Sequence, residues 1–144
     1  MQIIGFNFEN ISGEIKKPSN GKFEVNVDIN VLSVSQENLD IVKDKPVLKF
    51  VFEFSVNYKP ELAKINLKGS ILAILNQEQT KEILKTWKSE QLPEEVRLPL
   101  FNLILSKCTL KALQLEEELS LPTHIPLPRL LPEDKKDNKA KYTG

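Results

Sequence analysis

The sequence predicts an α+β protein in which a four-stranded antiparallel sheet is followed by two helices packed on one of its faces. Over the first half of the chain, apolar residues alternate with polar ones, which is the period of strands with one buried side. From Asn76 onward they recur at intervals of three and four, the period of an amphipathic helix. Strands followed by helices are typical of an α+β fold.

The first predicted strand changes phase along its length. The alternating positions are first Ile4, Phe6 and Phe8 and then, one residue out of step, Ile11, Gly13 and Ile15. Such a slip beside a glycine is typical of a β-bulge, and we expect the strand to change face partway. The dipeptide Asn20-Gly21 follows and predicts a hairpin, because both residues tolerate positive φ.

Three further strands complete the predicted sheet. Residues 23–31 alternate so regularly that one face should be buried and the other solvated, and residues 36–46 read as a loop. In the strand over residues 47–58 every even position is apolar, and the turn at Lys59-Pro60 leads into a strand over residues 63–73. Short connections between these segments favour antiparallel pairing.

Two helices are predicted after the sheet. Asn76 is suited to cap the first, with Gln79 three residues later as in a capping box, and this short helix should end near Gln91. The second begins around residues 92–95. Pro99 leaves two alternatives, a continuous or kinked helix through the proline or a separate turn before it, and we favour the former.

The second helix is apolar on two sides. Its main stripe consists of Phe101, Ile104, Leu105, Cys108, Ala112, Leu115 and Leu119, and the residues off the stripe are Leu100, Leu103, Leu110 and Leu113. A helix with two apolar sides usually packs against two bodies. In a small domain with one sheet, the second body is expected to be another subunit.

Composition limits the classes of function. At 144 residues the chain is about one domain long, and we assign residues 1–131 to it and 132–144 to a disordered mixed-charge tail. Twenty basic and twenty acidic residues give no net charge, which disfavours a nucleic-acid partner. No apolar run is long enough to insert in a membrane. The single cysteine, Cys108, and the absence of a recognisable leader point to the cytoplasm.

The sequence offers little reactive chemistry. His124, the one histidine, lies between prolines without partners at catalytic or ligand spacing, so a structural or exposed role is expected. Cys108 falls within an apolar stripe and reads as a buried thiol. The acidic runs at Glu94-Glu95 and Glu116-Glu117-Glu118 read as solvated faces, and no glycine-rich phosphate loop is present. We therefore expect no enzyme activity, no cofactor and no metal site.

Several segments resemble one known family. They are Ile71-Leu-Ala-Ile-Leu75 before the first helix, Leu98-Pro-Leu-Phe-Asn-Leu-Ile-Leu-Ser-Lys-Cys108 in the second, and the closing Leu121-Pro-Thr-His-Ile-Pro-Leu-Pro-Arg-Leu130. In this order, after four strands, they resemble the SecB family of export chaperones over residues 2–131. Bacterial export members are acidic, whereas this chain is neutral, so it looks more like divergent members such as the chaperones of toxin–antitoxin systems.

The resemblance implies a function and a site. It implies a holdase that binds apolar segments of unfolded polypeptides without ATP, with a link to protein export, and that assembles as a dimer of dimers. By position in the pattern, the client-binding residues would be Phe6, Phe8, Trp87, Leu92 and Leu98. Two alternatives stay open: an assembly protein that binds one specific partner, such as an antitoxin-like subunit, and a small enzyme that uses Cys108.

Overall fold

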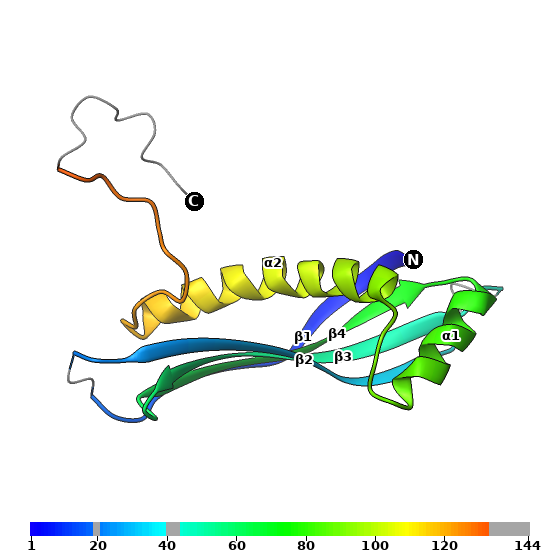
Figure 1. Ribbon diagram of the computed structural model, residues 1–144, viewed down its shortest axis with the longest axis horizontal. Helices are drawn as coiled ribbons and strands as arrows, with labels where there is room; N and C mark the ends of the chain where they lie inside the picture. Colours follow the sequence, from blue (N-terminus) through cyan, green and yellow to red (C-terminus); the bar gives the residue numbers. More distant parts are fainter. Residues whose placement is uncertain (19–20, 40–43, 133–144) are drawn as a thin grey trace.

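The computed structural model describes residues 1–18, 21–39 and 44–132. It contains four strands and two helices in that order, which confirms the predicted fold class (Figure 1). The elements are β1 (Gln2–Ile15), β2 (Glu24–Glu37), β3 (Val47–Lys59), β4 (Ala63–Ile74), α1 (Gln77–Trp87) and α2 (Glu94–Glu118). Of the predicted tail, residues 133–144 lie outside the described residues. Neither helix is long and apolar enough to cross a membrane within the part of the chain that is described.

The strands form one antiparallel sheet in the order β1-β4-β3-β2. The predicted hairpin at Asn20-Gly21 is therefore wrong, because the two strands that it would join lie at opposite edges of the sheet. Just after the end of β1, the chain lies beside the β3–β4 turn. There the amide of Lys16 donates to the carbonyl of Leu62 at 2.7 Å. A turn-forming dipeptide reports a local bend, and the partner of each strand is decided by distant residues.

The bulge predicted in β1 is present, but its consequence is the reverse of the one expected. The register shifts between Phe8 and Asn10, so that Phe8 lies opposite Gly69 and Ile11 lies opposite Leu67. Gly69 and Leu67 belong to the same face of β4, the one that α2 covers. The extra residue thus keeps the apolar side chains of β1 on one face, whereas an unbulged strand would have turned the second group away.

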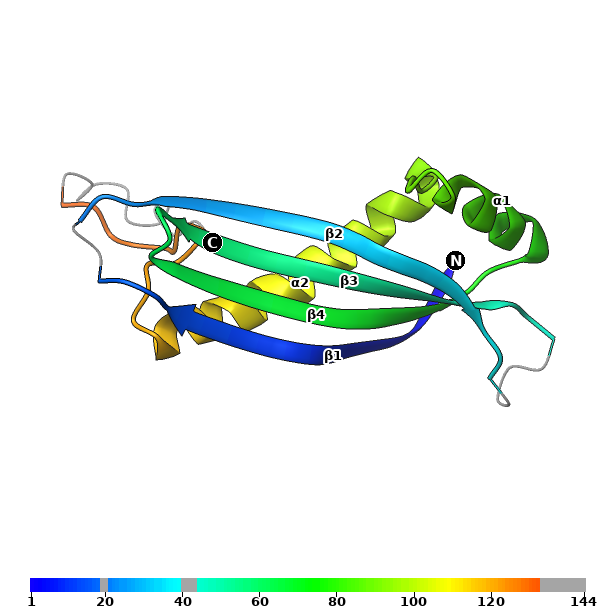
Figure 2. The same ribbon diagram turned by 90° about the horizontal axis from the view of Figure 1, so that it is seen from below.

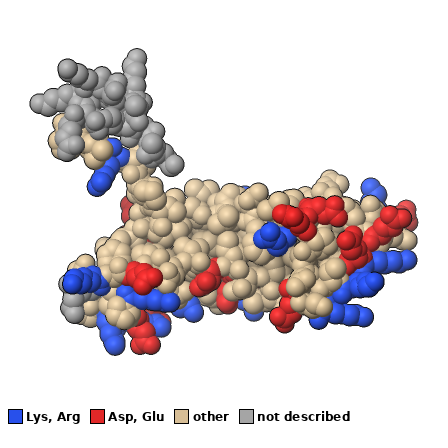
Figure 3. Space-filling view, in the orientation of Figure 1, with Lys and Arg blue, Asp and Glu red and all other residues tan. Residues whose placement is uncertain are grey.

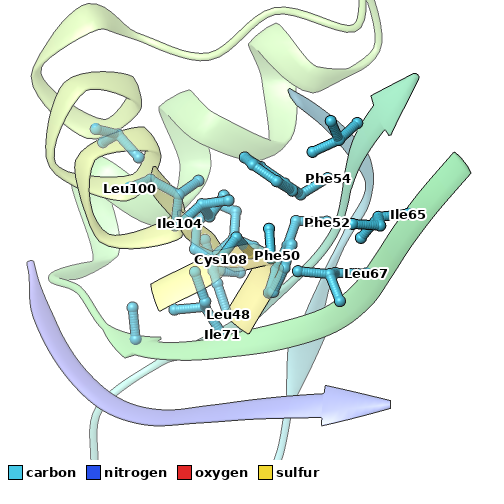
Figure 4. Packing of buried hydrophobic residues seen from close by; sticks show 14 of the residues in the cluster. Leu48, Phe50, Phe52, Phe54, Ile65, Leu67, Ile71, Leu100, Ile104 and Cys108 are labelled. Carbon is cyan, nitrogen blue, oxygen red and sulfur yellow. The ribbon is translucent and has the colours of Figure 1, made fainter. Parts of the chain in front are cut away.

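The core lies between this face and α2 (Figure 4). Every even residue of β3 from Leu48 to Tyr58 is buried there, as the alternation predicts. Gly69 is required within the core because a Cβ at this position would lie 2.3 Å from the backbone oxygen of Asn7 and 2.8 Å from Cζ of Phe52. The space above the glycine is filled by the Phe52 ring, which stacks on Phe6 with centroids 5.3 Å apart.

Strand β2 is less covered than its pattern predicts. Its apolar residues were expected to form a buried face, yet none of them is fully buried, and Val27 is 39% exposed. The reason is the path of α2, which crosses the sheet obliquely from the β2 edge at its first turns to the β1 edge at its last, and so covers only part of the length of β2 (Figure 2). The open residues that share the helix-side face are Val25, Val27, Ile29, Val31 and Val34.

Both helices begin where the sequence predicts. Asn76 caps α1 through a complete capping box with Gln79, and Ile83 anchors the helix in the core. Helix α2 runs without interruption through Pro99. Its buried side differs from the predicted stripe: the fully buried residues are Val96, Leu100, Ile104, Cys108, Ala112 and Glu116. Leu100 was expected off the stripe and is in the core, whereas Leu105 was placed on it and is exposed, because the buried line follows every fourth residue.

Candidate functional site

A groove lies along the open β2 edge, between the end of α1, the connection to α2 and the first turns of α2. It has a volume of about 450 Å³. Its apolar lining consists of Val31, Trp87, Leu92 and Phe101, and its polar lining of Asn30, Glu90, Gln91 and Arg97. Two of the predicted client-binding residues, Trp87 and Leu92, thus share one groove.

The connection between the helices gives the groove its shape. After α1 ends, the chain turns back sharply, with Glu90 in the left-handed region at φ 57° and the amide of Gln91 donating to the carbonyl of Thr86. This turn leaves Leu92 between the two helices, beside Trp87. Helix α2 then starts at Glu94, and the one-turn spacing of Arg97 and Phe101 sets both on the groove side.

The lining of the groove combines apolar and polar side chains. An apolar lining with a few polar groups suits an apolar side chain of a ligand whose backbone needs hydrogen-bond partners. The guanidinium of Arg97 lies 5.8 Å from the centroid of the Phe101 ring, so the cation is held at the rim by the ring face. In residues 1–18, 21–39 and 44–132, no group of three or more His, Cys, Asp and Glu side chains could hold a metal.

Phe6 and Phe8 lie away from this groove. They belong to β1, at the opposite edge of the sheet from β2. Both rings are half-buried and pack on the core, with an edge-to-face contact between them at 5.1 Å and the Phe6–Phe52 stack beneath. Any client contact that they make therefore belongs to a second surface along β1, where Ile11 and Ile15 are also exposed.

Leu98 lies in a third place. It is within α2 and 47% exposed, next to the exposed Pro99. Leu105 and Leu110 are exposed farther along the same helix, the latter at 70%. In the space-filling view most charged side chains lie toward the two ends of the molecule, and fewer lie in the middle of the face shown (Figure 3). The five predicted residues thus fall on three surfaces, and their role in client binding stays a prediction.

Six groove residues were not singled out from the sequence, among them Val31, Phe101 and Arg97. Val31 carries the alternating signal of β2, which was interpreted as buried core. Phe101 was placed on the main apolar stripe of the second helix, and Arg97 has no local pattern that marks it. One feature of the sequence could have indicated that Val31 is accessible. Long connections flank β2 on both sides, as is possible for an edge strand.

Buried polar groups lie at the other end of the sheet. Glu116, expected on a solvated face, is fully buried, and His124 contacts it with Nδ1 2.7 Å from Oε2. His124 is therefore structural, in line with one of the two roles expected. Cys108 is also buried, as predicted, and burial raises the pKa of its thiol to about 12, so the reactive thiolate is disfavoured.

Comparison with known proteins supports the fold. No family model matches the sequence, and no curated protein matches it. Among solved structures, the chain is similar to the SecB-like chaperone Rv1957 of Mycobacterium tuberculosis, determined in complex with a ChAD peptide from the HigA1 antitoxin Rv1956. The similarity covers 90% of both chains with a TM-score of 0.50 and 13% sequence identity. At this identity the likeness shows a SecB-like fold.

Proposed function

We propose that this protein is an ATP-independent holdase that binds apolar segments of non-native polypeptides. The observation that carries the proposal is the groove at the β2 edge, where Trp87 and Leu92 lie beside a partly exposed row of apolar β2 residues. Apolar area contributes roughly 25 cal/mol per Å² when it is buried, and much of this gain offsets the ordering of the bound chain. Affinity for many sequences therefore requires a long, open apolar surface.

The similar structure supports the proposal at the level of fold. That protein is named a SecB-like chaperone, and it holds a peptide. In this chain the groove lies at the β2 edge, next to the connection between the helices. A link to protein export is a narrower proposal that rests on the family resemblance of the sequence.

The groove contains its own spectroscopic probe, because Trp87 is the single tryptophan of the chain. We expect a tryptophan-free apolar peptide, added in increasing amounts, to shift the emission of Trp87 to shorter wavelength as the groove loses water. Leu92→Ser should weaken this binding by about 5- to 30-fold, since a buried leucine contributes about 1–2 kcal/mol of apolar burial. Leu127→Ser is the matched control, because Leu127 is 52% exposed and does not line the groove.

Aggregation assays test the activity itself. The purified protein should suppress aggregation of a thermally unfolding model substrate at near-stoichiometric ratios without nucleotide. Trp87→Ala should lose most of this suppression, and Leu127→Ser should retain it. Absence of suppression at several-fold excess of the wild-type protein would rule out the holdase function.

A second candidate function is favoured by the ligand of the similar structure, which is a peptide from one antitoxin. On this alternative, the groove of our protein binds a single partner sequence. A panel of unrelated apolar peptides separates the two candidates. A holdase binds many of them with similar affinities, whereas a specific partner protein binds one at least about 100-fold more tightly, a difference of about 2.7 kcal/mol.

We also propose that the protein is a homo-oligomer, a dimer of dimers as the resemblance implies. The exposed leucines of α2 and the outer edge of β1 are apolar or hydrogen-bonding surfaces that a second copy would cover. Light scattering should give a mass above that of one chain, and Leu110→Glu should lower it. A monomer at micromolar concentration would contradict the proposed oligomer. It would not bear on the proposed binding at the groove.

A further inference from the structure

The segment Leu121–Ile125 crosses the end of the core and is called the strap here. Helix α2 ends beside β1, where Leu119 approaches Gly13 so closely that a Cβ on the glycine would lie 2.7 Å from the leucine Cδ1. The chain then reverses at Ser120, with φ 54°, and runs back over the sheet to β3. There the rings of His124 and Phe54 are nearly perpendicular, with centroids 6.2 Å apart. Figure 1 shows the return of the chain after α2.

Glu116 forms hydrogen bonds with the strap near both of its ends, at Leu121 and at His124. Its backbone carbonyl accepts a hydrogen bond from the amide of Leu121 at 2.8 Å. Its carboxylate accepts from the amide of His124 at 3.1 Å and contacts His124 Nδ1 at 3.0 and 2.7 Å. The sheet also binds the strap: within the described residues, the hydroxyl of Tyr58 in β3 donates to the carbonyl of Pro122.

The Glu116–His124 contact is buried, and removing these polar groups from water costs free energy. Glu116 is fully buried and the His124 side chain is 2% exposed, so each depends on the other for the hydrogen bonds that water would otherwise supply. A carboxylate that loses its partner in such a place is strongly disfavoured. The strap can relieve this cost by moving away, because it is a short loop segment without ladder bonds to a strand.

The strap also covers apolar surface. Phe54 and Tyr58 are almost completely buried beneath it. Beside it lies a small pocket of about 290 Å³, to which the strap contributes Leu121 and Pro122 and the sheet contributes Phe23, Tyr58 and Leu62. Without the strap, these residues would form an apolar surface that extends from Phe54, in the middle of β3, to the end of that strand at Tyr58.

We infer that the strap is a releasable cover, held closed by the buried Glu116–His124 contact, whose opening exposes a second apolar surface around Phe54 and Tyr58 without unfolding the sheet. The inference does not depend on the holdase function. The Glu116–His124 contact then controls the position of the strap, and the strap opens independently of the cooperatively folded core.

Hydrogen exchange measured by mass spectrometry on the full chain tests it. In the wild-type protein, the strap amides of Leu121 and His124 should exchange ahead of the amides of β3 and β4, as expected for a part that opens on its own. Glu116→Gln should accelerate exchange in the strap by about 10- to 100-fold, the loss of a hydrogen bond to a charged group. His124→Ala should also accelerate it, because it removes the imidazole from the buried carboxylate and leaves only the backbone amide of residue 124 to bind it from the strap.

The matched control is Glu117→Gln, which removes the charge of an exposed neighbour and should leave strap exchange unchanged. Binding of the dye ANS should rise in Glu116→Gln and His124→Ala and not in the control. Equal exchange of strap and core in the wild-type protein would overturn the inference, even if neither variant folds. So would variants in which strap exchange stays at the wild-type rate, or in which strap and core accelerate together.

Discussion

Replacing three glycines of the sheet with alanine should produce a graded series of stability losses. At Gly69 the new methyl group would lie 2.3 Å from the backbone oxygen of Asn7 and 2.8 Å from Phe52. The oxygen belongs to β1 and is tied into the β1–β4 ladder, so the strands must separate locally. We expect Gly69→Ala to lower the free energy of unfolding by about 3 kcal/mol, at the upper end of the cost of overpacking.

The other two glycines calibrate this value. At Gly13 the conflict is with Leu119 Cδ1 at 2.7 Å, the flexible end of a side chain, and the loss should be about 1 kcal/mol. At Gly5 the nearest atom is Leu72 Cδ1 at 3.6 Å, an ordinary contact. Gly5→Ala should therefore be neutral or stabilise by up to about 1 kcal/mol, since alanine loses less backbone entropy on folding.

Urea denaturation followed by Trp87 fluorescence and circular dichroism measures the series, at one fixed protein concentration because assembly would shift the midpoint. In thermal melts, a loss of about 3 kcal/mol corresponds to a decrease in Tm of roughly 6–12 °C for a chain of this length. If Gly69→Ala were as stable as Gly5→Ala to within about 0.5 kcal/mol, the packing argument for Gly69 would be refuted.

Four further predictions concern the helix ends and the buried thiol. Ser120→Gly should stabilise the protein by up to about 1 kcal/mol in urea, because Ser120 has φ 54° at the end of α2, where glycine avoids the Cβ clash; a loss of stability would contradict this. Asn76→Ala should destabilise by about 1 kcal/mol by removing the α1 cap, and Gln77→Ala is its neutral control. Cys108 should resist alkylation in the folded protein at pH 8 and react at once in denaturant. Because the pKa of this thiol is raised from 9.0 to about 12 on folding, stability should fall as the pH rises above about 9, and Cys108→Ala should reduce that slope; an unchanged slope would contradict the assignment.

Much of the fold could be predicted because its signals are local. The even positions of β3 are apolar without exception, and a strand buried on one face requires that period. The cap of α1 depends on Asn76 and Gln79, only three residues apart. Trp87 and Leu92 come together for a similar reason, since one short connection separates them.

The remaining features depend on partners far along the chain. Glu116 lies among exposed glutamates, and nothing near it in sequence shows that the strap will return and place His124 against it. The bulge in β1 was visible, but its effect depends on the register with β4, which aligns Phe8 with Gly69. The groove residue Val31 was interpreted as core because alternation marks an apolar face and does not say whether a helix will cover it.

The strand order also determines how the chain can fold. Strands β3 and β4 are joined by a short turn and can pair as soon as both have emerged, whereas Gln2 of β1 must wait for Ile74, 72 residues later in the chain. Neither edge strand finds a partner in the other, although they are neighbours in sequence. During synthesis at the ribosome, β1 and its phenylalanines therefore remain unpaired until β4 is complete. For that interval the nascent protein exposes an apolar segment of the kind that it is proposed to bind in other proteins.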